Sequence, residues 1–262
     1  MLRAMDVIAL MESWAPGRYE KTCDTIKCGS PERAVEKAAV CCFATPEVIR
    51  EAAAWGAQLL ITHEPTFYDH WDEMEDTPAG HAKRKLLEET GLVLYRYHDH
   101  PHAAPADMIG LGEMAALGLP GALEERGAGQ INRYTLDTPI TPRELARHIE
   151  RQLHIAHVRI CGTTDEPCSR LALAFGTPRG AFEELSGWAE IVLTGEACEW
   201  RLGEYARDAA QLGIKKALLI LGHCGSERDG MRYIADLLAK ALPELSVRYL
   251  ESGEVYTYCE KE

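Results

Sequence analysis

Three histidines in this chain follow directly on apolar runs that have the composition of buried β-strands. These runs lie within "LLITHEP", "LVLYRYH" and "KALLILGH", and the histidines are His63, His98 and His223. Another potential ligand follows each of them, one residue later in the first case and four residues later in the other two: Glu64, His102 and Glu227. Imidazole and carboxylate groups bind divalent transition metals and transfer protons. The pattern therefore predicts a metal site or an acid–base site.

The segments around these residues alternate between strand and helix patterns, which predicts an α/β fold with mostly parallel sheets. Helices are predicted to begin at Thr45-Pro46 and Thr141-Pro142, where threonine caps the helix and proline occupies its first turn. Another helix is predicted over residues 82–90, ending at Gly91. Ligands of such sheets bind at the carboxyl ends of the strands. A first helical turn there would return a residue four positions later to the same edge.

One edge is thus expected to collect four imidazoles and two carboxylates, more than a single ion needs. Such a set suits two ions roughly 3.5–4 Å apart that share a water or hydroxide. Nitrogen and oxygen ligands without a thiolate favour Zn²⁺, Mn²⁺, Fe²⁺ or Ni²⁺ over Mg²⁺ or Ca²⁺. We therefore predict two divalent transition-metal ions held by six residues: His63, Glu64, His98, His102, His223 and Glu227.

Several neighbouring residues are left open by spacing alone. Asp99, His100 and Asp107 follow the second strand, and whether any of them joins the site is not decided. The remaining histidines have no evident partners, and we expect solvated surface roles for them: His70, His81, His148, His154 and His157. Cys224 and Ser226 lie between two predicted ligands, but no base and orienting group can be named for them, so nucleophilic catalysis is disfavoured. The sequence contains no phosphate-binding P-loop and no glycine-rich dinucleotide motif after a strand.

The pattern of elements restarts after a glycine-rich stretch near residues 120–129, which predicts an internal duplication. "WGAQLLITHEP" matches "WAEIVLTGEA" with a gap of one residue, so Glu196 is the counterpart of Glu64 and is expected to line the site. We predict two α/β lobes, residues 1–126 and 127–262. The last strand and helix, about residues 215–262, would return His223 and Glu227 to the site that both lobes share.

Composition excludes several classes of protein. The chain has 262 residues and a formal net charge of −13, from 28 basic and 41 acidic residues, which argues against nucleic acid binding. Nine cysteines without any C-x-x-C pair do not form a zinc-knuckle or disulfide framework. Charged residues interrupt the first sixteen positions, so this stretch lacks the apolar core of a signal peptide. No apolar run approaches the roughly 18 residues of a membrane span. We expect a soluble cytoplasmic protein with reduced cysteines.

The sequence resembles the Nif-three-like family of dinuclear-metal proteins, also labelled GTP cyclohydrolase type-2 homologues. The resemblance covers nearly the whole chain and rests on "LLITHEPTF", "GHCGSERDG" and "IVLTGE", while "EKTCDTIKCG" matches only loosely. Four residues fall unchanged on family metal positions: His63, His98, His223 and Glu227. Glu64 stands where the family has a second histidine, and His102 stands where it has aspartate. Together these two exchanges keep the count at four histidines and two acids.

The resemblance implies two lobes related by duplication, a metal pair in the cleft between them, and a toroidal homohexamer built from dimers. Our leading hypothesis is a metal-dependent hydrolase of a nucleotide-like or other phosphate-containing small molecule, with Glu64 or Glu196 as the general base. One alternative is a non-catalytic protein that binds, handles or delivers metal or serves as a regulatory scaffold. Another is a structural oligomer whose metals brace the lobes. The ligands would look alike in all three, so the sequence leaves them open.

Overall fold

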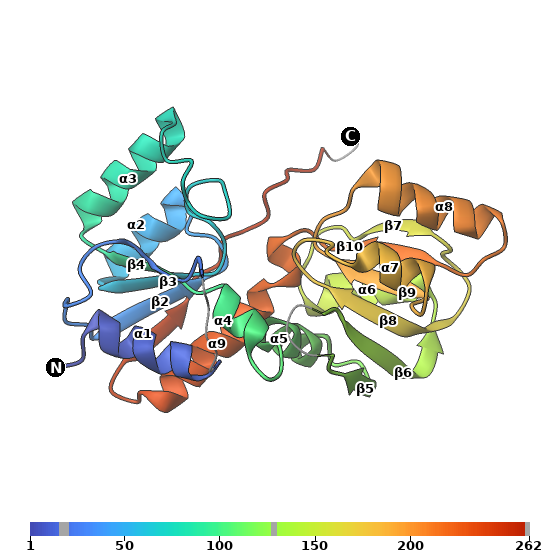
Figure 1. Ribbon diagram of the computed structural model, residues 1–262, viewed down its shortest axis with the longest axis horizontal. Coiled ribbons are helices and arrows are strands. Elements are labelled where there is room, and N and C mark those ends of the chain that lie inside the picture. The colour runs from blue at the N-terminus through green and yellow to red at the C-terminus, as the bar shows by residue number, and fades with distance from the viewer. Residues whose placement is uncertain (16–20, 127–129, 260–262) are drawn as a thin grey trace. The chain divides into compact units, whose positions relative to one another are not determined.

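The computed structural model describes residues 1–15, 21–126 and 130–259, and its chain forms two compact units. The first unit contains residues 1–109 and 230–253, and the second contains residues 110–229 and the chain from Glu254 onward (Figure 1). The chain passes from the first unit to the second within α5 (Met108–Leu117) and returns within α9 (Arg228–Ala241). This division differs from the predicted lobes, because the C-terminal β11 (Ser246–Tyr249) pairs with a strand of the first unit.

The first unit is built on a five-stranded sheet in the order β1-β4-β3-β2-β11. Its other strands are β1 (Ile26–Cys28), β2 (Lys37–Cys41), β3 (Leu59–Thr62) and β4 (Val93–Arg96). All neighbours are parallel except β1, which runs antiparallel to β4 at the edge. Helices α2 (Pro46–Trp55) and α3 (Pro78–Thr90) cover one face, and α1 (Ala4–Ser13) and α9 cover the other (Figure 1). A short helix, α4 (Asp99–Ala103), follows β4.

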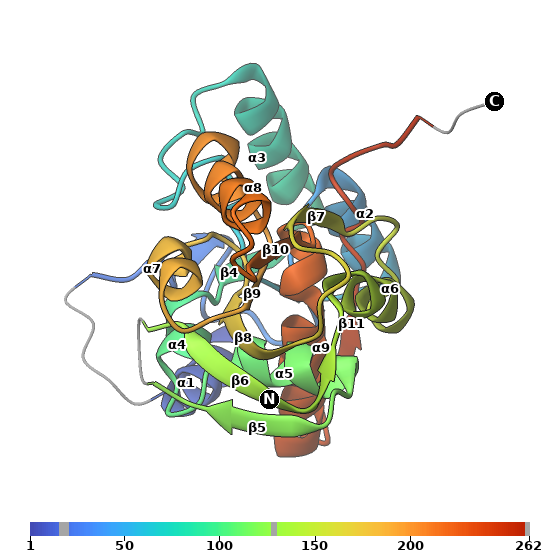
Figure 2. The ribbon, with the colours of Figure 1, turned by 90° about the vertical axis from the view of Figure 1, so that its right-hand side faces the viewer.

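The second unit is built on a six-stranded sheet in the order β5-β6-β8-β9-β10-β7. Its strands are β5 (Gly121–Glu124), β6 (Asn132–Ile140), β7 (Arg159–Gly162), β8 (Cys168–Ala174), β9 (Ile191–Thr194) and β10 (Ala217–Ile220). Only β8, β9 and β10 are mutually parallel. Helix α6 (Pro142–Gln152) covers one face, and α7 (Ala181–Ser186) and α8 (Glu204–Gln211) cover the other (Figure 2). The predicted α/β class is confirmed, but the expectation of mostly parallel sheets holds only for the first unit, because β5, β6 and β7 each run antiparallel to their neighbours in the second sheet.

Capping explains where the helices begin and end. Thr45 and Thr141 each accept a backbone N–H with their hydroxyl group, and both helices have proline in the first turn, as predicted. Gly91 ends α3 in the left-handed conformation with φ 66°. This helix begins at Pro78, four residues before the predicted start, because Thr77 provides a cap that the periodicity of apolar residues did not reveal.

The two units repeat the same order of elements. In the first unit the order is α1-β1-β2-α2-β3-α3-β4, and in the second it is α6-β7-β8-α7-β9-α8-β10. The central three strands are parallel in both, and the first strand of each series runs antiparallel to the last one at a sheet edge. Such a shared topology is what the predicted internal duplication would produce.

Hydrogen bonds of side chains repeat as well. Gln58 accepts two consecutive backbone N–H groups at the start of β2, and Glu190 accepts two near the start of β8. The hydroxyl group of Thr62 donates to the carbonyl of Glu64, and that of Thr194 donates to the carbonyl of Glu196. The structure therefore supports the match of residues 55–64 with residues 188–196. These hydrogen bonds also show that the one-residue gap in the match lies before the strands β3 and β9.

Glu190 is expected to make the stability of the protein depend on acid pH. Burial raises the pKa of this carboxyl group, but hydrogen bonds from Lys215 and the backbone outweigh burial and lower it to about 2. The ionised Glu190 stabilises the fold fully above the pKa that glutamate has in the unfolded chain, roughly 4.3. This stabilisation declines as the pH falls toward the pKa of Glu190 in the folded protein. Between pH 6 and 3.5, wild type should lose about 1 kcal/mol more unfolding free energy than Glu190→Gln, measured in urea. Equal losses would contradict this assignment.

Candidate functional site

Three histidines of the first unit lie in mutual contact at the carboxyl ends of two parallel strands. His63 follows β3, His98 follows β4, and His102 lies in α4. The ring centroids are 4.7 Å apart for His63 and His98, 5.1 Å for His63 and His102, and 5.0 Å for His98 and His102. One nitrogen from each ring lies within 4.8 Å of the others. We call these three residues the histidine cluster.

In each ring of the cluster, Nδ1 faces an acceptor. For His63, His98 and His102 in turn, the acceptors are the carbonyl oxygen of Tyr97 at 3.0 Å, Asp99 Oδ1 at 3.1 Å and Asp107 Oδ2 at 3.3 Å. An Nδ1 that donates leaves the lone pair on Nε2, the arrangement of histidine ligands in metal proteins. Burial, together with the neighbouring His98, lowers the pKa of His63 well below its ordinary value. Its ring is thereby kept neutral, as metal binding requires.

Glu64 adds a carboxylate to this arrangement. Its Oε1 lies 3.7 Å from Nε2 of His63 and 3.6 Å from Nε2 of His98. A tetrahedral ion with bonds of about 2.0–2.2 Å holds its ligand atoms about 3.4 Å apart. The three atoms therefore fit around one divalent ion after small side-chain movements.

Asp107 is expected to raise the metal affinity of the cluster by orienting His102. Replacing it by asparagine removes the charge that holds this ring, and loss of such an outer partner lowers metal affinity by about 10–100-fold. The measurement is Zn²⁺ affinity by competition with a chelating dye. Asp76→Asn is the matched control, because Asp76 pairs with an exposed histidine, His81, outside the cluster. Equal affinities of the two variants would refute the role of Asp107.

Asp24 fixes the turn that carries His98. Its Oδ1 accepts the backbone N–H groups of His98 and Asp99, both at 2.8 Å, and its Oδ2 accepts the N–H of His100 at 2.9 Å. Oδ2 also lies 2.6 Å from Nδ1 of His100, so this histidine is engaged by Asp24. Burial raises the pKa of Asp24, but these hydrogen bonds prevail and lower it below its usual range. Sequence reasoning missed Asp24, and its only signal was the loose match of "EKTCDTIKCG".

Arg96, the last residue of β4, was also missed. Its side chain is fully buried, and its Nε donates to the carbonyl of His63 at 3.0 Å while Nη1 donates to the carbonyl of His70. Nη1 also lies 3.6 Å from Oδ2 of Asp72, which in turn lies 3.1 Å from Nζ of Lys27. Asp72 accepts two backbone N–H groups of the same loop with its other oxygen. Arg96 therefore anchors the loop that begins with His63 and Glu64.

The second unit positions a histidine between two carboxylates. His223 follows β10; its Nδ1 lies 2.7 Å from Oε1 of Glu196, and its Nε2 lies 3.2 Å from Oε2 of Glu227. Glu196 therefore orients the ring as Asp99 does for His98, while Glu227 shares the side of the ring that carries Nε2. Ser226, in the turn η2 (Cys224–Ser226), donates to the carbonyl of His223 at 2.9 Å. This role of Ser226 is structural.

Glycine provides the space for these side chains. Gly176 follows β8 with φ 65°, and a Cβ atom there would lie 2.1 Å from Oε1 of Glu227 and 3.3 Å from Nε2 of His223. A Cβ atom at Gly195 would lie 2.6 Å from Oγ of Ser226. A side chain at Gly176 would displace Glu227 itself, and a side chain at Gly195 would displace Ser226, which positions His223.

Each unit thus brings together the predicted residues that it contains. His63, Glu64, His98 and His102 meet in the first unit, and His223, Glu196 and Glu227 meet in the second. Asp99 and Asp107, which the sequence left open, orient ring nitrogens. His70 was predicted to have no partners, but its ring lies 5.5 Å from the His98 ring, and one of its nitrogens lies within 4.8 Å of ligand atoms of Cys23 and Asp99.

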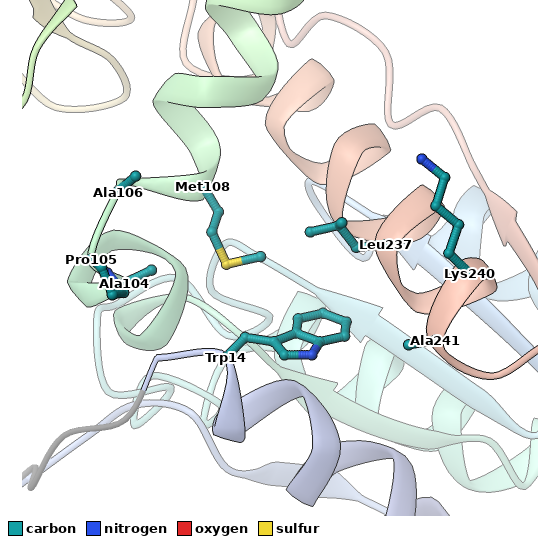
Figure 3. A pocket seen from close by; sticks show the side chains of 8 residues that line it. All are labelled: Trp14, Ala104, Pro105, Ala106, Met108, Leu237, Lys240 and Ala241. Carbon is teal, nitrogen blue, oxygen red and sulfur yellow. The ribbon is translucent and has the colours of Figure 1, made fainter.

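An apolar hollow of about 460 Å³ lies elsewhere in the first unit (Figure 3). Trp14, Met108 and Leu237 line it, and Lys240 is the one charged residue among the described residues around it. A single ammonium group in apolar surroundings provides neither the metal ligands nor the paired acids of the clusters above. The chemistry of the described residues is therefore concentrated at the strand ends.

Among the described residues, no helix combines the length and apolar character needed to cross a membrane.

A sequence profile of the family Duf34/NIF3 (NGG1p interacting factor 3) matches residues 2–254. Two relatives named "GTP cyclohydrolase 1 type 2 homolog" align over nearly the whole chain. The protein of Clostridium acetobutylicum is 23% identical over 94% of this chain and 93% of its own, and that of Clostridium perfringens is 22% identical over 97% of both.

Solved structures show the same fold at low sequence identity. A Bacillus cereus protein related to NIF3 aligns with a TM-score of 0.79 and 14% identity over 100% of this chain and 99% of its own. Reduced HcgD from Methanocaldococcus jannaschii aligns with a TM-score of 0.73 and 17% identity over 95% and 98%. The match to the family profile spans nearly all of the sequence, and the chain belongs to the Duf34/NIF3 family.

Proposed function

We propose that the histidine cluster with Glu64, and the pair His223 and Glu227, together hold two divalent transition-metal ions in one dinuclear centre. The observation that carries the proposal is the orientation of the imidazoles. In the three cluster rings and in His223, Nδ1 faces an oxygen acceptor, which leaves Nε2 for a metal. Neutral imidazoles with nearby carboxylates favour Zn²⁺, Mn²⁺, Fe²⁺ or Ni²⁺.

The function that we propose is metal-dependent hydrolysis of a nucleotide-like or other phosphate-containing small molecule. Such ions supply a nucleophilic hydroxide at neutral pH and polarise the bond under attack. Asp99, Asp107 and Glu196 orient the imidazoles, and Arg96 fixes the loop behind His63. Oε1 of Glu64 lies 3.7 Å from Nε2 of His63 and 3.6 Å from Nε2 of His98, and we propose this residue as the proton acceptor. Glu196 was a second candidate for this role, but its contact with Nδ1 of His223 favours positioning. The names of the Clostridium relatives support the nucleotide class.

A turnover assay tests this function. Protein loaded separately with Zn²⁺, Mn²⁺, Fe²⁺ or Ni²⁺ is incubated with nucleoside triphosphates and phosphate monoesters, and product formation is measured. Glu64→Gln should lower kcat by about 10²–10⁴-fold, the usual contribution of a general base. Glu89→Gln, on the exposed side of α3, is the control and should leave kcat unchanged. Absence of turnover in loaded wild type would refute the hydrolase and favour the alternative of a non-catalytic protein that handles metal.

The assembly that we propose is the one that the family resemblance implies, and the location is the one that the composition of the chain favours. We propose a homohexamer in the cytoplasm, with a small molecule as its other partner. Light scattering coupled to size-exclusion chromatography measures the mass of the assembly directly. A mass near six chains is expected, and a monomer at micromolar concentration would contradict the hexamer.

A further inference from the structure

A second set of possible metal ligands lies beside the histidine cluster. Cys23, His70 and Asp99 each offer one ligand atom, and these three atoms lie within 4.8 Å of one another. They come from three separate segments: the chain before β1, the loop after β3, and the first residue of α4. Cys23 is 1% exposed. A thiol, an imidazole and a carboxylate therefore converge from parts of the first unit that are distant in sequence.

The surrounding structure holds this set in place. Oδ2 of Asp99 accepts the hydroxyl of Thr22 at 2.8 Å and the backbone N–H of Cys23 at 3.1 Å, which fixes the carboxylate beside the thiol. The Sγ atom of Cys23 lies 3.6 Å from Oδ1 of Asp24. Since Asp24 also caps the turn at residues 98–100, the segments that carry Cys23 and Asp99 are joined rigidly. The geometry needs no rearrangement of the backbone to present all three groups.

The loop that carries His70 is held by other contacts. The buried Arg96 donates to the carbonyl of His70, and the ring of His70 packs edge-on against Trp71 with centroids 4.6 Å apart. Lys21 in turn packs on Trp71, with its Nζ 3.6 Å from the centre of the indole ring. The imidazole is thus placed by an anchored loop.

We propose that Cys23, His70 and Asp99 form a separate site for one divalent cation of the Zn²⁺ class. A thiolate selects borderline-soft ions such as Zn²⁺, Co²⁺ or Fe²⁺ over Mg²⁺ and Ca²⁺. With bonds of about 2.3 Å to sulfur and about 2.0–2.2 Å to nitrogen and oxygen, the ligand atoms would lie roughly 3.3–3.7 Å apart. Small side-chain rotations would bring the three ligand atoms, which lie within 4.8 Å of one another, to that spacing. On binding, the thiol proton is released to solvent and the sulfur coordinates as thiolate.

The experiment uses Co²⁺ as the probe, because cobalt bound to a thiolate has a charge-transfer absorption band in the near ultraviolet that imidazole and carboxylate ligands do not produce. Metal-free full-length protein is titrated with Co²⁺ without oxygen and with a phosphine reductant. We expect the band in wild type and in Cys28→Ser, and its loss, with one bound Co²⁺ fewer, in Cys23→Ser. His70→Ala should weaken the Co²⁺ affinity measured by the band at least about 100-fold, because it removes a direct ligand.

The outcomes separate this site from the dinuclear centre. The double variant His63→Ala/His223→Ala should keep the band even where it loses other ions. The result for this site is therefore independent of the result for the proposed function. A wild type without the band would overturn the proposal. A band that survives Cys23→Ser would also overturn it, since the thiolate would then belong to another cysteine. Circular dichroism of each variant verifies folding, and His70→Ala tests the site even where Cys23→Ser does not fold.

Discussion

Replacing Arg96 by methionine is expected to lower the free energy of unfolding by about 3–5 kcal/mol. The guanidinium is fully buried and is shared between two backbone carbonyls and Asp72. Removal of one partner of a buried ionic group leaves the others desolvated and without their donor. Lys27 remains beside Asp72, so the main loss falls on the carbonyls of His63 and His70. Urea unfolding followed by circular dichroism measures the effect.

Arg143→Met is the control for Arg96→Met. Arg143 pairs with Asp165 on the surface, with side-chain exposures of 48% and 70%, and such pairs contribute less than about 1 kcal/mol. The Arg96 variant should also bind metal more weakly at the histidine cluster, because the loop that begins at His63 loses its anchor. An effect of Arg96→Met no larger than that of Arg143→Met would contradict the role assigned to this residue.

Gly176→Ala is expected to disrupt His223 and Glu227, the metal ligands that we propose in the second unit. The new methyl group would lie 2.1 Å from Oε1 of Glu227, so this carboxylate, whose Oε2 lies 3.2 Å from Nε2 of His223, must move. The left-handed backbone, with φ 65°, adds a strain of roughly 1–2 kcal/mol. We expect the affinity for the ion held by His223 and Glu227 to fall by at least about 100-fold, because a direct ligand is displaced. Titration with Zn²⁺ against a chelating dye measures the loss.

Gly213→Ala separates crowding from backbone strain. Gly213 has φ 74° in the same unit, but a Cβ atom there meets no other atom within 4 Å. Both variants should lose a similar part of their stability, whereas only Gly176→Ala should lose metal affinity. If Gly213→Ala weakens metal binding as strongly, the crowding of Glu227 is not the cause.

The class of the fold and the grouping of residues within each unit could be predicted from the sequence. Buried strands that end in histidine place those side chains at a sheet edge whatever the details of packing, since parallel strands share that edge. The repeated Trp-to-Glu segments revealed the match between the units, and equivalent side chains make equivalent hydrogen bonds in both. These are local patterns, and local patterns can be read from a sequence.

Other features depend on contacts between distant segments. Asp24 lies 74 residues before His98, and no periodicity links a capping carboxylate to the turn that it caps. Arg96 reads as the polar end of a strand, yet it is buried because Asp72 and two carbonyls surround it. The helix α9 and the strand β11 follow the second unit in sequence but belong to the first, since β11 pairs with β2. Nothing in residues 230–253 alone indicates that return.

The central claim is that the ligands of the two units hold one pair of ions, and elemental analysis tests it most directly. The proteins are wild type, His63→Ala, His223→Ala and the double variant, all with Cys23→Ser so that the further site does not contribute. We expect about two transition-metal ions per chain in the parent and none in the double variant. Each single variant should weaken the binding of both ions, because two ions in one centre would share a water or hydroxide. A parent that folds without metal and cannot be reloaded would contradict the claim, and so would single variants that each lose only their own ion.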